Sequence, residues 1–192
     1  MNDTELKTLE YPPLTEDLEE AKTHLDEYGM ALIANVLDKD EVEEMDQRLN
    51  EQFLGEEKYK VGSKVRGDEG LGKESTEEEK VSRLVWNLIN KGDCFLKLID
   101  HPKIMPLIQH LIGERVSLCS MGAHMNGSGN EKMALHQDQW PLVPHPMDFP
   151  FMANVMYLIS DNSPENGGTR LIPGSHKWPL IDYRTANGEE IQ

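Results

Sequence analysis

The sequence has few cysteines and no long apolar run. Cys94 and Cys119 are the only thiols among 192 residues, which excludes a disulfide-stapled scaffold. Both lie among apolar neighbours, so we expect two buried, reduced thiols. No stretch approaches the roughly 18–20 apolar residues that a membrane helix needs. The first five residues also lack the basic and apolar regions of a secretory signal. These absences predict a cytoplasmic protein with no membrane partner.

Basic residues are also scarce. The chain has 19 Lys and Arg against 35 Asp and Glu, a net charge of −16. Residues 1–80 carry 24 acidic and 10 basic side chains, whereas residues 81–192 carry 11 and 9. An acidic surface repels phosphate backbones, so we expect no nucleic-acid partner. The acidic runs predict a solvated face, and no pattern indicates an oligomeric state.

The N-terminal part has helix and strand patterns. Residues 1–14 predict a loose leader, and residues 15–192 predict one domain. Thr15 is expected to cap a helix that Gly29 ends, and the apolar residues 30–36 predict a buried strand. Asp38, with Glu41 three residues later, is typical of a second helix start. That helix has an apolar stripe, formed by Val42, Met45 and Leu49.

The next segments change from helix to strand. Residues 55–80 contain five glycines and no apolar period, which predicts a mobile loop. Residues 81–89 predict a strand or a short helix, and residues 93–99 and 104–112 predict helices. Strands are expected at 116–125, 151–160 and 169–172, with a turn at 161–168. Helices followed by strands indicate an α+β domain.

A His-x-Asp pair follows the 116–125 segment. Side chains alternate faces along a strand, so His136 and Asp138 are expected to project together, with Gln137 on the opposite face. One imidazole and one carboxylate are two thirds of the 2-His-1-carboxylate set that holds non-haem Fe(II) with open positions. The spacing therefore predicts a metal site at His136 and Asp138.

Several motifs together resemble the phytanoyl-CoA dioxygenase family. They are His136-Gln137-Asp138, the apolar run at 151–159, Asn166-Gly167-Gly168, the Pro-Gly-Ser-His turn at 173–176, and the pattern at 28–33. The resemblance covers roughly residues 15–180. It implies a double-stranded β-helix, or jelly-roll, core of the cupin-like type with N-terminal helices. It also implies an Fe(II)- and 2-oxoglutarate-dependent dioxygenase that hydroxylates a small organic substrate with O2, giving succinate and CO2.

The chain departs from the family's pattern after residue 176. The family has a second histidine ligand and a carboxylate-binding arginine on later strands, and no such segment follows Asp138 here. We therefore expect a chain that is incomplete at its C-terminus, lacking the last strands, and inactive and weakly stable alone. The alternative is a non-catalytic cupin-like binding module or a pseudoenzyme. By resemblance, His176 shapes its loop, although it is also a candidate third ligand.

Other polar residues are candidates for the 2-oxoglutarate site. Asn154 is a polar residue in an apolar run, so its amide is expected to contact 2-oxoglutarate or water. Arg170 is a candidate replacement for the carboxylate-binding arginine, or else a surface residue. Met121 and His124 lie before the His-x-Asp motif and are candidates for the pocket wall, with core packing favoured for Met121.

Overall fold

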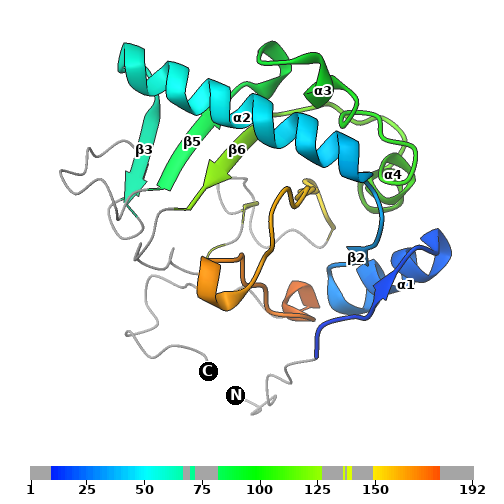
Figure 1. Cartoon of the computed structure of the whole chain (residues 1–192). Helices are drawn as coiled ribbons and strands as arrows, with labels where there is room; N and C mark the ends of the chain where they lie inside the picture. The colour runs from blue at the N-terminus through cyan, green and yellow to red at the C-terminus, as the bar shows by residue number, and fades with distance from the viewer. Residues whose placement is uncertain are drawn as a thin grey trace, which may run out of the picture.

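The computed structural model describes residues 10–66, 70–71, 82–126, 136, 138–139 and 149–177. The long helix α2 (Lys39–Tyr59) lies across an antiparallel sheet with the strand order β4-β3-β5-β6 (Figure 1). The strands of this sheet are β3 (Ser63–Arg66), β4 (Gly70–Leu71), β5 (Ser82–Trp86) and β6 (Gly122–Met125). A separate parallel pair joins β1 (Leu14–Thr15) to β2 (Leu32–Ile33). The predicted mixture of helix and strand is confirmed. Neither sheet closes within the described residues, so the jelly-roll stays a prediction.

Helix α1 (Leu18–Tyr28) begins two residues later than predicted. Its N-cap is Asp17, whose Oδ1 accepts from the backbone N–H groups of Glu19 at 2.8 Å and Glu20 at 3.2 Å. The Thr15 hydroxyl instead accepts from the Asp17 N–H at 3.0 Å. The prediction of Thr15 as the cap was wrong because an aspartate nearer the apolar stripe satisfies the free N–H groups. Gly29 ends the helix with φ 73°, as predicted.

Helix α2 begins where predicted, after Asp38, and extends further than predicted, to Tyr59. Asp38 accepts from the Glu41 N–H at 2.8 Å, and the Glu41 carboxylate accepts from the Asp38 N–H at 2.9 Å. The helix continues to Tyr59, and β3 and β4 follow it. The loop predicted for residues 55–80 was therefore wrong at 55–59, 63–66 and 70–71. The helix continues past Gly55 because Glu and Lys, which follow at 56–58, favour a helix. Residues 67–69 and 72–80 lie outside the described residues.

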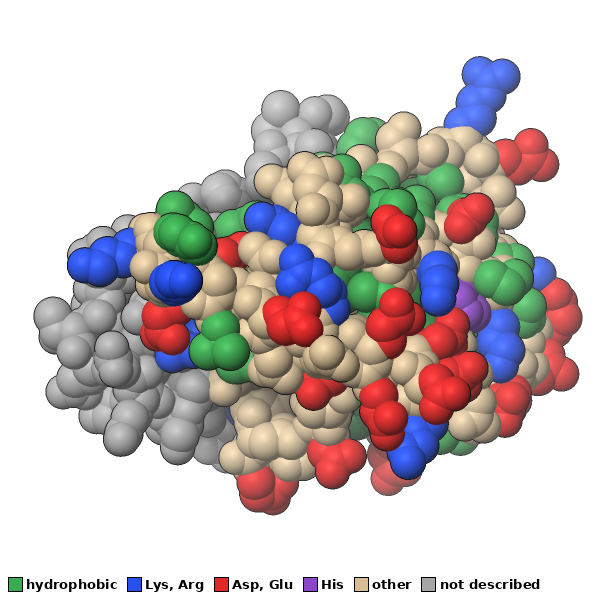
Figure 2. All heavy atoms as spheres, turned by 45° about the horizontal axis from the view of Figure 1, so that its top comes forward, with side chains coloured by type: hydrophobic (Ala, Val, Ile, Leu, Met, Phe, Trp, Pro, Cys, Tyr) green, Lys and Arg blue, Asp and Glu red, His purple; other side chains and the backbone are tan. Residues whose placement is uncertain are grey.

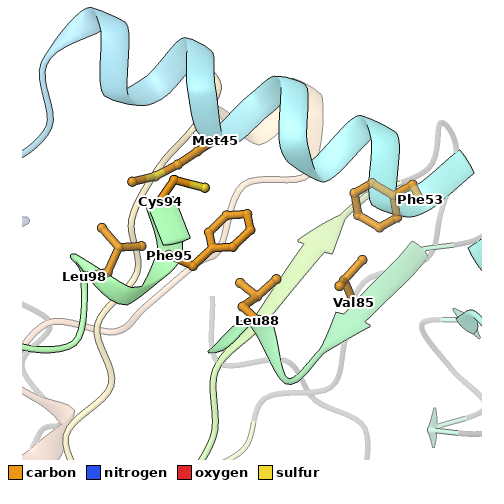
Figure 3. Close-up of a cluster of buried hydrophobic side chains, with 7 residues drawn as sticks. All are labelled: Met45, Phe53, Val85, Leu88, Cys94, Phe95 and Leu98. Carbon is orange, nitrogen blue, oxygen red and sulfur yellow. The ribbon is translucent and has the colours of Figure 1, made fainter. Parts of the chain in front are cut away.

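The core lies between α2, the sheet and the short helix α3 (Asp93–Leu96), as Figure 3 shows. Helix α2 contributes Met45 and Phe53, and β5 contributes Val85. The rest of the buried cluster comes from the chain that follows β5: Leu88, Cys94, Phe95 and Leu98. The expectation of a buried thiol is confirmed for Cys94, whereas Cys119 is exposed.

Helix α2 carries part of the predicted acidic face, because many of its residues are Asp or Glu. Figure 2 shows Asp and Glu side chains distributed over this side of the molecule, with Lys and Arg between them. Several carboxylates of α2 pair with cations from other elements, such as Glu44 with Lys97 at 3.6 Å and Glu57 with Arg83 at 3.2 Å. Such exposed pairs contribute little to stability, so the apolar core carries most of the binding of α2 to the sheet.

Helix α4 (Met105–Ile112) packs beside α1. Pro106 lies in its first turn, where a missing N–H costs nothing, and the helix ends at Ile112, as the range 104–112 predicted, with Gly113 following. Across the interface, His110 Nε2 lies 2.8 Å from Asp26 Oδ1. Between β5 and α4 lie the 3-10 helix η2 (Leu88–Asn90) and α3, which is shorter than the predicted helix at 93–99.

Two predicted strands are shorter than expected, and two are missing. The segment 30–36 forms only β2, and the segment 116–125 forms only β6. The segments 151–160 and 169–172 have no strand, and Phe151, Met156 and Leu158 are more than half exposed. Apolar composition predicted burial there, but a strand also needs a hydrogen-bonding neighbour. Within the described residues, β6 pairs only with β5.

The C-terminal part of the described chain returns to α1. After the 3-10 helix η3 (Pro164–Asn166), the predicted turn at 161–168 is completed by Gly167 with φ 78°. The 3-10 helix η4 (Ser175–Lys177) then packs against the end of α1. The Gly174 N–H donates to the Tyr28 carbonyl at 2.7 Å, and His176 Nε2 lies 3.3 Å from the Asp26 carbonyl oxygen. No helix in the described ranges is long and apolar enough to cross a membrane.

Truncating Phe95 is expected to test the core. This ring is 1% exposed, so Phe95→Ala should lower the free energy of unfolding by about 3–5 kcal/mol. Phe151 is 54% exposed, so Phe151→Ala is a matched control with an expected change within about 0.5 kcal/mol. Urea unfolding followed by circular dichroism measures both. Equal losses for the two variants contradict the assignment of the core.

Gly29 is expected to tolerate no side chain. Alanine there strains the positive φ by about 1–2 kcal/mol, and its Cβ would lie 2.3 Å from His176 Nδ1. Gly29→Ala should therefore cost more in the wild-type background than in a His176→Ala background, where only the strain remains. A double-mutant cycle of urea midpoints measures this coupling. The same cost in both backgrounds shows that the imidazole does not fill this space.

Candidate functional site

The structure brings His136 and Asp138 together. His136 Nε2 lies 3.4 Å from Asp138 Oδ1, and the two side chains are 49% and 52% exposed. The predicted juxtaposition is therefore present, although residues 138–139 form a turn and not a strand. Residue 137 lies outside the described residues, so the direction of its side chain stays a prediction.

Asn154 contacts the other oxygen of the same carboxylate. Its Nδ2 donates a hydrogen bond to Asp138 Oδ2. The two oxygens of Asp138 thus have different neighbours, His136 on one side and Asn154 on the other. Asn154 was predicted as a contact for 2-oxoglutarate or water. The structure places it directly beside the predicted metal site.

Gln139 joins the turn to the segment that carries Asn154. Its Oε1 accepts from the backbone N–H groups of Phe151 at 2.5 Å and Met152 at 2.9 Å. Sequence reasoning missed this residue. The only signal was its position directly after the His-x-Asp motif, because one side-chain oxygen that accepts from two distant N–H groups leaves no periodic pattern.

Two further contacts fix this region to the scaffold. The Tyr157 hydroxyl donates to the Leu98 carbonyl at 3.0 Å, and Tyr157 and Ile159 pack against the core cluster. Burial raises the pKa of Tyr157 to about 12. Directly after β6, Asn126 Nδ2 donates to the Gly167 carbonyl at 2.7 Å, which fixes the 161–168 turn to the end of this strand. The sequence did not indicate Tyr157 or Asn126 for these contacts.

The donor set at His136 and Asp138 fits a divalent cation such as Fe(II). Neighbouring ligands at about 2.1 Å in octahedral geometry lie about 3 Å apart, close to the observed 3.4 Å. An imidazole nitrogen and a carboxylate oxygen suit iron. Half of each side chain is exposed, which leaves room for further ligands. Among the described residues, no group of three His, Cys, Asp or Glu side chains forms a metal site.

The remaining predicted site residues lie in different surroundings. Met121 packs against the core cluster, and its carbonyl accepts from the Leu88 N–H at 3.0 Å. Arg170 is exposed, and in the described part of the chain no hydrogen bond or ion pair joins it to Asp138 or Asn154. His124 lies on β6, where desolvation of its ring lowers its pKa.

His176 lies at the end of α1. A small pocket of about 80 Å³ is formed there by Tyr28, Gly29, Met30, Leu171, Ile172, Ser175 and His176. Burial lowers the pKa of His176, although the Asp26 carbonyl acts in the opposite direction. The observed contacts of this imidazole are with Asp26 and Gly29, which agrees with the expectation that it shapes its loop.

One family model and several relatives named as dioxygenases match the chain. The family model described as phytanoyl-CoA dioxygenase matches residues 25–190. A dioxygenase named af480 from Aspergillus fumigatus is 30% identical over 178 residues, which cover 93% of this chain and 55% of that protein. A probable alpha-ketoglutarate-dependent hypophosphite dioxygenase from Stutzerimonas stutzeri is 29% identical over 119 residues, 62% of this chain and 41% of that protein.

A third relative and the lengths complete the comparison. The dioxygenase sphC from another Aspergillus fumigatus strain is 25% identical over 173 residues, 85% of this chain and 46% of that protein. The chain thus spans about half the length of the curated relatives that it matches. No solved structure matches the chain.

Replacing Tyr157 is expected to change the alkaline stability. Because folding raises its pKa from 10 to about 12, the folded state favours the neutral phenol. This contribution is complete below pH 10 and is lost as the pH rises towards 12. Tyr157→Phe should therefore reduce the fall of stability between pH 10 and 12. Tyr59→Phe, at a tyrosine that is 71% exposed, is the control. Urea midpoints of the three proteins are measured between pH 10 and 12. If the midpoint falls equally with pH in wild type and both variants, the burial of Tyr157 is contradicted.

Proposed function

Because the chain belongs to the phytanoyl-CoA dioxygenase family, we propose that it carries part of the active site of an Fe(II)- and 2-oxoglutarate-dependent dioxygenase. The proposed reaction hydroxylates a small organic substrate with O2 and yields succinate and CO2. The observation that carries the proposal is the 3.4 Å approach of His136 Nε2 to Asp138 Oδ1 inside the matched residues.

The two side chains have complementary roles in this proposal. His136 supplies a neutral nitrogen, and Asp138 supplies an anion that favours a divalent ion. Their half-exposed positions leave one side of the ion accessible to small molecules. When bound, iron and 2-oxoglutarate supply the oxidising chemistry, and the protein positions them. The third protein ligand of such a site is not among the described residues.

Three further residues are proposed to surround 2-oxoglutarate. Asn154 lies beside Asp138 and presents an amide close to the metal position. Arg170 is exposed and carries the planar guanidinium that suits a carboxylate, and this role requires its side chain to turn towards the site. Met121 packs against the core, so its proposed role is an apolar wall. The proposed fold around these residues is the jelly-roll of the family.

The substrate is proposed only as a class. The relative from Stutzerimonas stutzeri is named for hypophosphite, and the two fungal relatives are named only as dioxygenases. A shared fold hosts many substrates, so none of these names is transferred to this chain. The alternative function is a cupin-like module that binds a ligand without turnover. Metal binding alone does not distinguish the dioxygenase from the binding module. Succinate production does, because only the dioxygenase turns over 2-oxoglutarate.

Loss of either metal ligand is expected to abolish the activity. His136→Ala and Asp138→Ala should each eliminate Fe(II)-dependent formation of succinate from 2-oxoglutarate and weaken Mn(II) binding at least about 10-fold, because each removes a ligand. The assay uses the protein at the length of its relatives, with succinate measured by mass spectrometry.

The control for these variants is Gln137→Ala, which removes no predicted ligand. It should retain most of the succinate formation and the Mn(II) affinity. Near-normal turnover in either ligand variant overturns the metal assignment. Metal and 2-oxoglutarate binding without succinate formation in the wild type favours the binding module.

A further inference from the structure

The carboxylate of Asp138 is held from two directions. Oδ1 lies 3.4 Å from His136 Nε2, while Oδ2 accepts the Asn154 amide hydrogen bond. A free aspartate rotates about its last torsion and can present either oxygen, or both, to a cation. The Asn154 bond removes this freedom, because an N–H that occupies Oδ2 leaves Oδ1 as the oxygen beside the imidazole.

From this arrangement we propose that Asn154 is a positioning residue that fixes Asp138 for metal binding through Oδ1 alone. The inference rests on the proposed function, because it concerns the same metal site. It gives Asn154 a role in metal binding that does not require 2-oxoglutarate, in addition to the 2-oxoglutarate contact proposed for its amide. An amide that donates to a metal-binding carboxylate orients it before the ion arrives, and losing such a partner typically weakens metal binding by about 10–100-fold.

Gln139 supports the same arrangement from the backbone. By accepting from the N–H groups of Phe151 and Met152, its side chain holds the start of the segment that carries Asn154. The turn at 138–139 therefore contributes the carboxylate of Asp138 and also Gln139, which holds the segment that carries Asn154. We assign Gln139 to this network as a second positioning residue, which acts on Asp138 through Asn154.

The Asp138 side chain is half exposed, and its partner Asn154 is exposed. Exposure makes the hydrogen bond compete with water, so one contact alone leaves Asp138 mobile. The two Gln139 contacts, at 2.5 and 2.9 Å, oppose this by fixing the backbone only two or three residues before Asn154. The network therefore orders an exposed carboxylate without burying it, which keeps the site open to the ion and its further ligands.

The test measures Mn(II) binding in the absence of 2-oxoglutarate. Mn(II) replaces Fe(II) as a probe that does not oxidise, and electron paramagnetic resonance reports the free ion. Asn154→Ala and the similarly sized Asn154→Leu should each raise the Mn(II) dissociation constant about 10-fold. Gln139→Ala should shift it in the same direction, and Gln139→Glu, which keeps the acceptor oxygen, should not raise it.

The matched control is Asn50→Ala on α2. Asn50 Nδ2 donates to Asp46 Oδ2 at 3.1 Å, so this variant also removes an exposed hydrogen bond between an asparagine and an aspartate. It should leave Mn(II) binding unchanged. Urea midpoints confirm that every variant is folded. The Asn154 and Gln139 effects should also be less than additive when combined, because both act through one carboxylate.

The outcomes are distinct. If the Asn154 variants bind Mn(II) more weakly in the absence of 2-oxoglutarate, the positioning role is supported. Unchanged Mn(II) affinity with weakened 2-oxoglutarate binding at saturating Mn(II) overturns it and makes Asn154 a direct 2-oxoglutarate contact, while the proposed function stands. If the wild type and His136→Ala bind Mn(II) equally weakly, both the inference and the metal assignment are overturned.

Discussion

One stripe of α2 is buried against the sheet and α3, and this packing positions the other segments of the chain. Met45 and Phe53 on the helix contact a cluster that includes Val85 on β5 and Phe95 on α3. Fully burying a side chain of this size contributes about 1.5–3 kcal/mol, whereas the exposed ion pairs of α2 contribute far less. The same cluster holds Tyr157 and Ile159, so it also sets the position of the segment that leads to the candidate site.

The site is therefore held by side chains that reach back to this scaffold. Tyr157 connects its segment to the Leu98 carbonyl, and Asn126 connects β6 to the 161–168 turn. Between these anchors, Gln139 and Asn154 link the His-x-Asp turn to the neighbouring segment. Each step consists of one or two hydrogen bonds on a partly exposed surface, so the candidate site is ordered while it stays accessible to solvent.

Sequence patterns predicted what depends on neighbouring residues and missed what depends on distant ones. The Asp38 capping box and the Gly29 helix end were found, because each is completed within a few residues. The proximity of His136 and Asp138 was also found, although a turn and not a strand produces it. The strand expected at 151–160 was wrong, since its formation requires a neighbour that apolar composition does not identify. Gln139 was missed because its partners lie 12 and 13 residues away.

The contact of η4 with the end of α1 has a consequence for synthesis of the chain. The carbonyl groups of Asp26 and Tyr28 meet His176 and Gly174, and Tyr11 meets Leu171, so these partners are separated by 146 to 160 residues. Helix α1 can form early on the ribosome, but its last turn acquires these partners only after residue 176 has been translated. Contacts over such separations slow folding, and until they form the exposed end of α1 is available to chaperones.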